Sequence, residues 1–81
     1  MIITLKLSES LLSIYYAAGR PMAETIVMEL AEPLTIAQIL EQAGINQLLT
    51  PMVIIDDEVC KLTQLIEHSS VITLIGPLAG G

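Results

Sequence analysis

The side chains that most often do chemistry in proteins are scarce in this sequence. It holds a single cysteine, Cys60, and a single histidine, His68, and nothing in the pattern brings them together. It also lacks a Gly-rich phosphate-binding loop and metal-ligand spacings such as Cys-x-x-Cys or His-Glu-x-x-His. We therefore interpret Cys60 as a small buried side chain and His68 as a solvated turn residue.

One acidic cluster, Asp56-Asp57-Glu58, has the ligand chemistry for a hard cation, because carboxylate oxygens suit Ca²⁺ or Mg²⁺. Three neighbours in a tight turn rarely converge on one ion, so we interpret the cluster as a solvated hairpin turn. The sequence predicts no resident metal and no bound cofactor.

The two terminal glycines, Gly80 and Gly81, are the feature that folding explains least, because glycine loses the most conformational freedom when it is ordered. They would form a thin, Cβ-free strand ending in a carboxylate, suited to threading a narrow channel in another protein. Pro77 would stiffen such a tail, and Leu78 would anchor it in an apolar slot. The alternative is a frayed terminus that happens to be rich in glycine.

The composition is that of one small globular domain. Of the 81 residues, 53% are hydrophobic and 15% charged, which is incompatible with a disordered chain. Three basic against nine acidic residues give a net charge of −6. Direct binding to nucleic acid is therefore not expected, since the phosphate backbone requires a basic surface. An acidic surface suits a basic protein partner instead.

The cysteine count and the lengths of the apolar stretches also predict the cellular compartment. A single cysteine cannot form an internal disulfide. The longest charge-free stretches, 42–55 and 68–81, are shorter than the roughly 20 apolar residues that span a bilayer. The first residues also lack the basic region of a signal peptide. We expect a cytoplasmic protein with no membrane association.

Hydrophobic periodicity predicts the elements before residue 32. Alternation over 3–7 and again over 23–30 indicates two strands. Between them, Ser8 or Ser10 would cap a short helix that Gly19 closes. This helix would present Leu11, Leu12 and Tyr15 on one face.

The second half of the chain reads as a helix followed by strands. Thr35 and Gln38 form a capping box for a helix over 36–43, which Gly44 would end and on which Ile45 would fold back. The predicted strands are a central one over 52–55, a brief return over 59–62 and a final one over 71–75. Leu65 or Ile66 would plug the core from the irregular segment 63–70.

Strands at both ends of the chain around one main helix predict an α+β fold. A right-handed crossover places the first and last strands side by side in the middle of a mixed sheet of four or five strands. This is the β-grasp, or ubiquitin-like, arrangement. We predict a domain over 1–75 and a flexible Gly-Gly tail over 76–81.

The end of the chain carries a more specific resemblance. Residues 71–81 read Val-Ile-Thr-Leu-Ile-Gly-Pro-Leu-Ala-Gly-Gly, and 55–59 read Ile-Asp-Asp-Glu-Val. The sequence resembles the sulfur-carrier branch of the ubiquitin-like proteins, which includes the molybdopterin synthase small subunit (MoaD) and the thiazole-synthesis carrier (ThiS). Room for an extra helix within residues 8–34 makes it more similar to the MoaD type. It departs from that type in having Gly76-Pro77 in place of Pro-Pro and no arginine-rich first helix.

The resemblance implies a non-enzymatic carrier that acts as a covalent substrate. A ubiquitin-activating-type adenylyltransferase would use ATP and Mg²⁺ to adenylate Gly81, and a sulfur donor would convert it to a thiocarboxylate. Gly76, Pro77, Leu78, Ala79 and Gly80 would thread the tail into a sulfur-accepting enzyme, such as a molybdopterin synthase large subunit or thiazole synthase. Two alternatives stay open: a ubiquitin-like modifier conjugated to lysines through Gly81, and a passive β-grasp interaction domain.

Overall fold

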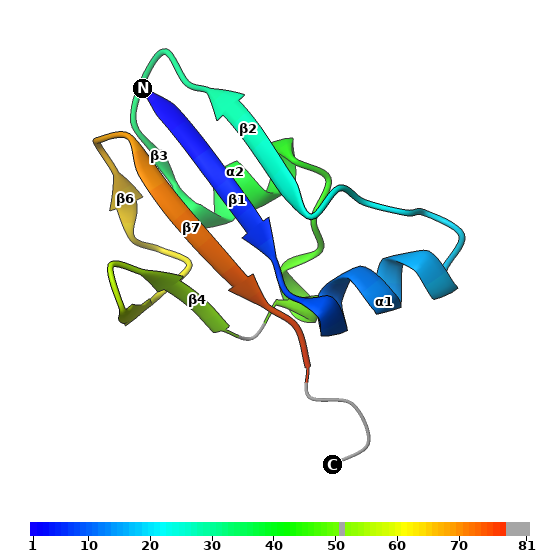
Figure 1. Ribbon diagram of the computed structural model, residues 1–81. Coiled ribbons are helices and arrows are strands. Elements are labelled where there is room, and N and C mark those ends of the chain that lie inside the picture. The colour runs from blue at the N-terminus through cyan, green and yellow to red at the C-terminus, as the bar shows by residue number, and fades with distance from the viewer. Residues whose placement is uncertain (51, 78–81) are drawn as a thin grey trace.

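The computed structural model describes residues 1–50 and 52–77, and these residues form a mixed sheet with helices on one side and at one end (Figure 1). Seven strands, two α-helices and one 3₁₀ helix are formed in the described part. The strands are β1 (Ile2–Leu7), β2 (Thr25–Glu29), β3 (Leu34–Thr35), β4 (Met52–Ile55), β5 (Glu58–Cys60), β6 (Leu65–Ile66) and β7 (Ser70–Ile75). The helices are α1 (Glu9–Ala17), α2 (Ile36–Gln42) and the 3₁₀ helix η1 (Gln47–Leu49).

The main sheet has five strands in the order β2-β1-β7-β4-β5. The first and last strands, β1 and β7, are parallel neighbours in its middle, and the other neighbouring pairs are antiparallel. The predicted mixed sheet with central terminal strands is thereby confirmed. β2 spans only 25–29 of the predicted 23–30, and the return strand lies at 58–60 rather than 59–62.

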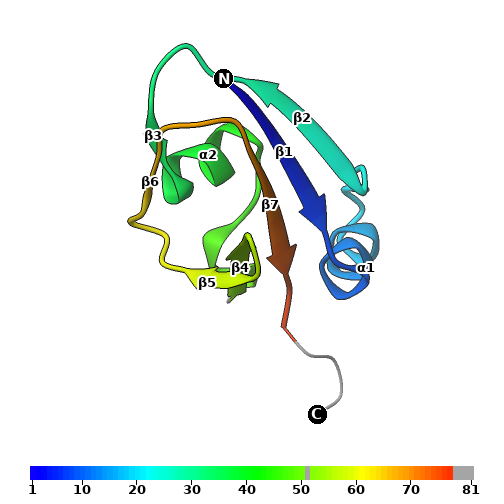
Figure 2. The same cartoon turned by 60° about the vertical axis from the view of Figure 1, so that its left-hand side comes forward.

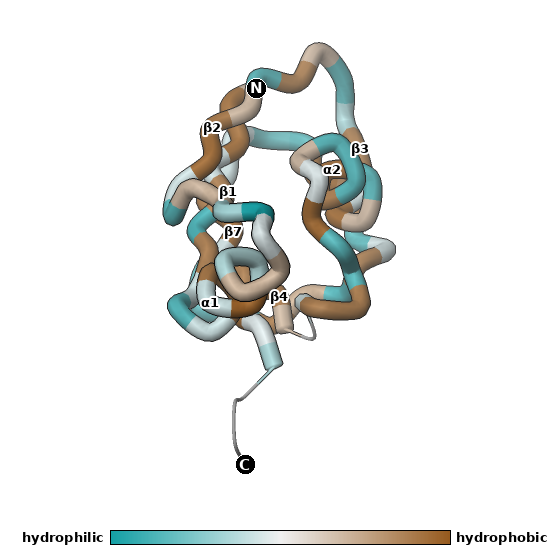
Figure 3. The backbone as a smooth tube through the Cα atoms, turned by 90° about the vertical axis from the view of Figure 1, so that its right-hand side faces the viewer, coloured by the Kyte–Doolittle hydropathy of each residue, from teal (hydrophilic) through white to brown (hydrophobic). Residues whose placement is uncertain are grey.

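The core lies between the sheet and α2, which form two layers (Figures 2 and 3). Alternate residues of β1 and β7 point into it, and each is at most 4% exposed: Ile3, Leu5, Leu7, Ile72 and Leu74. From α2 come Ile36, Ile39 and Leu40, which are fully buried. Because side chains alternate along a strand, the residues between them point to the opposite side of the sheet.

Local sequence explains where α2 begins and ends. The Thr35 hydroxyl accepts a hydrogen bond from the Gln38 amide at 3.2 Å, and the Gln38 side chain accepts one from the Thr35 amide at 2.9 Å. This is the predicted capping box. Gly44 ends the helix with a φ of +76°. The Ile45 amide then bonds the Leu40 carbonyl, and Ile45 is buried, as expected.

The two-residue strands β3 and β6 pair with each other in a small second sheet, which the sequence analysis did not predict. Their pairing accompanies the capping of α2. The amides of Ile36 and Ala37 bond the carbonyls of Gln64 and Leu62, so the first turn of the helix holds this segment in place. Ile66 is the residue that fills the core, at 4% exposed, whereas Leu65 is exposed.

The predicted short helix is α1, and it lies at the end of the sheet beside the point where β7 stops (Figure 1). It is longer than α2 by residue count, although α2 is the helix that covers the sheet. Leu11 and Tyr15, four residues apart, are its buried pair. The Tyr15 hydroxyl accepts a hydrogen bond from the Asn46 amide at 2.8 Å, which ties α1 to the turn after α2. Within the described ranges, no helix has the length and apolarity needed to cross a bilayer.

Candidate functional site

The root of the C-terminal segment is fixed by hydrogen bonds to the residue that caps α1. The Ser8 amide donates to the Leu74 carbonyl at 2.9 Å, and the Gly76 amide donates to the Ser8 Oγ at 3.1 Å. The same Oγ accepts from the Leu11 amide at 3.3 Å as the N-cap of α1. One hydroxyl thus joins the start of the first helix to the end of the last strand.

Gly76 is also fixed by close packing against α1. Gly76 is buried, and a Cβ built on it would lie 3.0 Å from both the Cα and the backbone nitrogen of Leu11. Backbone atoms inside a helix have little freedom to move aside, so a side chain at this position would force the strand and the helix apart. Glycine is needed here for a close approach between two backbones.

Of the six residues predicted to form the tail, the structure describes only Gly76 and Pro77. Gly76 lies within the packed domain, one residue past the predicted boundary at 75, and Pro77 is exposed. The remaining predicted site residues, Leu78, Ala79, Gly80 and Gly81, lie outside the described residues. Their assignment to a threading tail, and that of Gly81 to the acyl site, stays a prediction.

The structure does not bring the other reactive side chains together. Cys60 is half-buried on the core side of β5, and its Sγ lies 3.5 Å from the Glu58 carbonyl oxygen. His68 is exposed in a turn, where its carbonyl accepts a hydrogen bond from the Ser70 hydroxyl at 2.8 Å. The position of His68 agrees with its interpretation as a solvated turn residue, whereas Cys60 is only half-buried and not the fully buried side chain that was expected. Within 1–50 and 52–77, no three His, Cys, Asp or Glu side chains are grouped to hold a metal ion.

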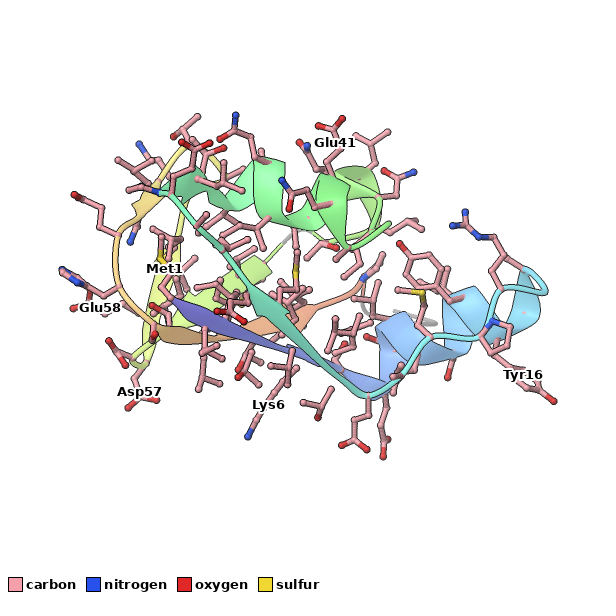
Figure 4. The ribbon with its side chains drawn as sticks, turned by 90° about the horizontal axis from the view of Figure 1, so that it is seen from above. Met1, Lys6, Tyr16, Glu41, Asp57 and Glu58 are labelled. Atoms are coloured by element: carbon pink, nitrogen blue, oxygen red, sulfur yellow. The ribbon has the colours of Figure 1, made fainter. Side chains whose placement is uncertain are left out.

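The hairpin between β4 and β5 turns at Asp56 and Asp57, as predicted for the acidic cluster. Their φ angles are +51° and +64°, so both residues adopt the left-handed conformation that a two-residue hairpin requires. Aspartate tolerates this conformation better than most residues with a side chain. Both carboxylates are exposed at the edge of the molecule (Asp57 is labelled in Figure 4).

The side of the main sheet away from α2 is not covered by any described helix, and we call it the outer face. Five large apolar side chains on it are exposed by at least 41%: Ile2, Val27, Met52, Val59 and Val71. Lys6 projects from the same face, away from α2 (Figure 4). The outer face is continuous with Gly76, which we call the tail root, because the face includes the last strand, β7.

Comparison with known proteins is informative at the level of the fold. No protein-family profile matches the chain, and no curated protein matches its sequence. Two solved structures are similar in three dimensions, and both are of small archaeal modifier protein 1 (SAMP1) from Haloferax volcanii. One superposes with a TM-score of 0.67 at 18% identity over 100% of both chains. The other has a TM-score of 0.62 at 14% identity and covers 95% of this chain and 98% of that one.

These likenesses define the class of fold. The chain has the ubiquitin-like β-grasp architecture that its element order predicted, and it matches these structures over nearly their whole length. At such low identity the likeness concerns the fold alone. What a β-grasp chain of this kind does must be argued from its own residues.

Gly76→Ala tests the close approach at the tail root. The added methyl group meets the Leu11 backbone, so we expect a loss of about 1–3 kcal/mol in the free energy of unfolding. Urea denaturation of the purified chain measures it. Pro77→Ala is the matched control, because Pro77 is exposed and its loss acts through the unfolded chain, at less than about 1 kcal/mol. Equal stability of Gly76→Ala and the parent chain would contradict the packing.

Ser8 substitutions test the hydrogen bond to the tail root. Ser8→Ala removes the cap and the acceptor for Gly76, whereas Ser8→Gly removes the same acceptor but weakens the cap by only a few tenths of a kcal/mol. We expect faster hydrogen exchange of the Gly76 amide in both variants, measured by NMR. Ser13→Ala, at an exposed position of α1, should leave that amide protected. Unchanged Gly76 exchange in Ser8→Gly would refute the role of Ser8.

Proposed function

We propose that this chain is a sulfur carrier whose Gly81 carboxylate is activated and converted to a thiocarboxylate by partner enzymes. The observation that carries the proposal is the fixed root at Gly76. β7 is central in the sheet, and Gly76 is bonded to Ser8 and packed on Leu11, so everything beyond it leaves a rigid domain from a defined point. A domain that fixes the position of Gly76 suits a protein that presents the residues after Gly76 to other active sites.

In this proposal the chemistry takes place at the carboxylate of Gly81. That carboxylate attacks the α-phosphorus of ATP in the adenylyltransferase and displaces pyrophosphate, which leaves an acyl-adenylate. A sulfide nucleophile then attacks the acyl carbon, AMP leaves, and the thiocarboxylate forms. The partner supplies ATP, Mg²⁺ and the acid and base groups, while this chain supplies recognition and placement.

The shape of residues 77–81 would help them to enter the active site of a partner enzyme. Gly80 and Gly81 have no Cβ, so catalytic groups of a partner are able to approach the backbone closely. Pro77 restricts the segment to extended conformations, which lowers the entropy lost on insertion. Leu78 is the candidate anchor in an apolar slot. The sulfur acceptor would be an enzyme of cofactor synthesis, foremost a molybdopterin synthase large subunit and otherwise a thiazole synthase.

A second candidate function is that of a protein modifier, and the similarity in fold to small archaeal modifier protein 1 favours it. A modifier shares the adenylation step, but its acyl group passes to the amine of a target lysine and forms an isopeptide bond. Conjugates that survive reducing denaturation separate this function from a carrier, because a thiocarboxylate forms no such adduct.

Pyrophosphate exchange tests the activation step that both candidates share. With a candidate adenylyltransferase, Mg-ATP and labelled pyrophosphate, we expect the full chain to support label incorporation into ATP. A chain that ends at Gly80 should reduce the exchange to background, since the reacting carboxylate is then one residue short. Lys61→Ala, in the exposed turn after β5, should exchange like the parent chain. Equal exchange by the truncated chain would refute the role of Gly81 and favour a passive interaction domain.

A further inference from the structure

The strand β2 lies at the rim of the main sheet (Figure 2), and the hydrogen bonds at its two ends show which of its backbone groups point toward β1. Just before β2, the Glu24 carbonyl accepts a hydrogen bond from the Leu7 amide at 2.9 Å. Just after β2, the Leu30 amide donates to the Met1 carbonyl at 2.9 Å. The backbone groups of residues 24 and 30 therefore face the inner neighbour of β2.

The backbone groups between these two ends alternate in direction. In an antiparallel pair every second residue bonds the neighbouring strand, so residues 26 and 28 bond β1. The amides and carbonyls of Thr25, Val27 and Glu29 then point away from the sheet. Within 1–50 and 52–77, no hydrogen bond from outside the β1–β2 pair reaches these groups. They are therefore open to a further strand.

β2 also lacks the features that usually keep an edge strand from pairing. Natural edge strands are short, carry lysine or proline, or contain a bulge. β2 has five residues that pair with β1 in unbroken register, and its one charged residue, Glu29, stands at its end. The opposite edge strand, β5, has three residues, begins with Glu58 and follows two aspartates. Of the two edges of the main sheet, β2 is the one suited to pairing.

We infer that β2 pairs antiparallel with β2 of a second copy of this chain, around a twofold axis at Val27. In this register Val27 lies opposite Val27 of the second copy, and Thr25 lies opposite its Glu29. It is the one antiparallel register in which all three outward residues are paired with one another. The two five-stranded sheets then join into one continuous sheet.

The side chains of β2 suit a second copy in this register. Glu29 faces an uncharged threonine, so like charges are not placed opposite each other. On the core side of the sheet, Ile26 would lie opposite Met28 of the second copy. Both residues are half-buried at the border of the core, and this contact would cover apolar surface that the single chain leaves open. The sequence of β2 is thus complementary to itself.

The pairing is independent of the proposed function. β1 and β7 end beside the Thr25 end of β2, because β1 is antiparallel to β2 and parallel to β7. The twofold axis would therefore put the two tail roots at opposite ends of the joined sheet, where neither takes part in the interface. A chain that ends at Gly80 should dimerise as the full chain does.

Sedimentation equilibrium of the full-length chain tests the pairing. We expect a reversible monomer–dimer equilibrium that strengthens as salt is added, because each copy has a net charge of −6 and salt screens the repulsion. Val27→Pro should raise the dimer dissociation constant at least about tenfold, since it removes the two amides at the twofold axis. The single chain tolerates proline there, because this amide faces outward. Val27→Thr is the matched control, which keeps the amide and a β-branched side chain and should dimerise within about threefold of the parent.

Hydrogen exchange measured by NMR tests the same pairing in the unaltered chain. The amides of Thr25, Val27 and Glu29 should exchange more slowly as the concentration rises through the dissociation constant. The amides of Ile26 and Met28, which bond β1, should be protected at every concentration. If circular dichroism shows that Val27→Pro is unfolded, Val27→Lys replaces it, because this variant keeps the amide and places two ammonium groups across the axis.

Two results would overturn the inference. One is a parent chain that stays monomeric at concentrations up to about 1 mM, since a weaker dimer would not form appreciably. The other is a dimer in which the outward amides of β2 exchange as fast as in the monomer, because the interface would then lie elsewhere. If the parent chain is monomeric alone and another protein protects these amides, the occupant of the edge is a strand of that protein and not a second copy.

Discussion

The parallel pairing of β1 and β7 is the constraint on which the other features depend. It joins residues from opposite ends of the chain, from Ile3 opposite Ser70 to Leu7 opposite Leu74. Parallel neighbours require a long crossover connection, and here it contains all the other described helices and strands. The apolar residues of both strands alternate, so the pairing builds one continuous apolar surface against which α2 packs (Figure 2).

The same pairing creates the tail root. Since β1 and β7 run in the same direction, the residues that follow them emerge at the same end of the sheet. Ser8 follows β1 and caps α1, and Gly76 follows β7. The Ser8 hydroxyl and the Gly76 amide therefore meet although they are 68 positions apart in sequence. The opposite side of the two strands forms the middle of the outer face. The two-layer core, the fixed position of Gly76 and the outer face therefore all depend on the pairing of β1 with β7.

Most of the strands and the start of α2 were predictable because their sequence patterns are local. Alternation predicted β1 and β2, a short continuous apolar run predicted β4, and the Thr35 and Gln38 pair predicted the start of α2. A buried Gly76 was not predicted, because its reason is a long-range contact with Leu11 that no local pattern encodes. The available signal was a glycine directly after a buried strand, in place of the proline of similar tails. β3 and β6 were missed because two-residue strands have no periodicity to detect.

The face that points outward was also beyond prediction, since a shift of one residue exchanges the two sides of a strand. The structure places Ile72 and Leu74 inside and Val71 outside, and with that choice Lys6 becomes part of the outer face. The acidic composition suggested a basic partner. The structure adds that the one basic residue of β1, Lys6, projects from the outer face.

The central claim of the proposed function is that the Gly81 carboxylate is used for sulfur transfer, and intact-protein mass spectrometry tests it most directly. The full chain is incubated with a candidate adenylyltransferase, Mg-ATP and a sulfide source, beside a chain lacking Gly81. The account predicts a mass gain equal to the exchange of one oxygen for one sulfur, and only in the chain that has Gly81. An unchanged mass with an adenylyltransferase that binds the chain, or the same gain without Gly81, would contradict it.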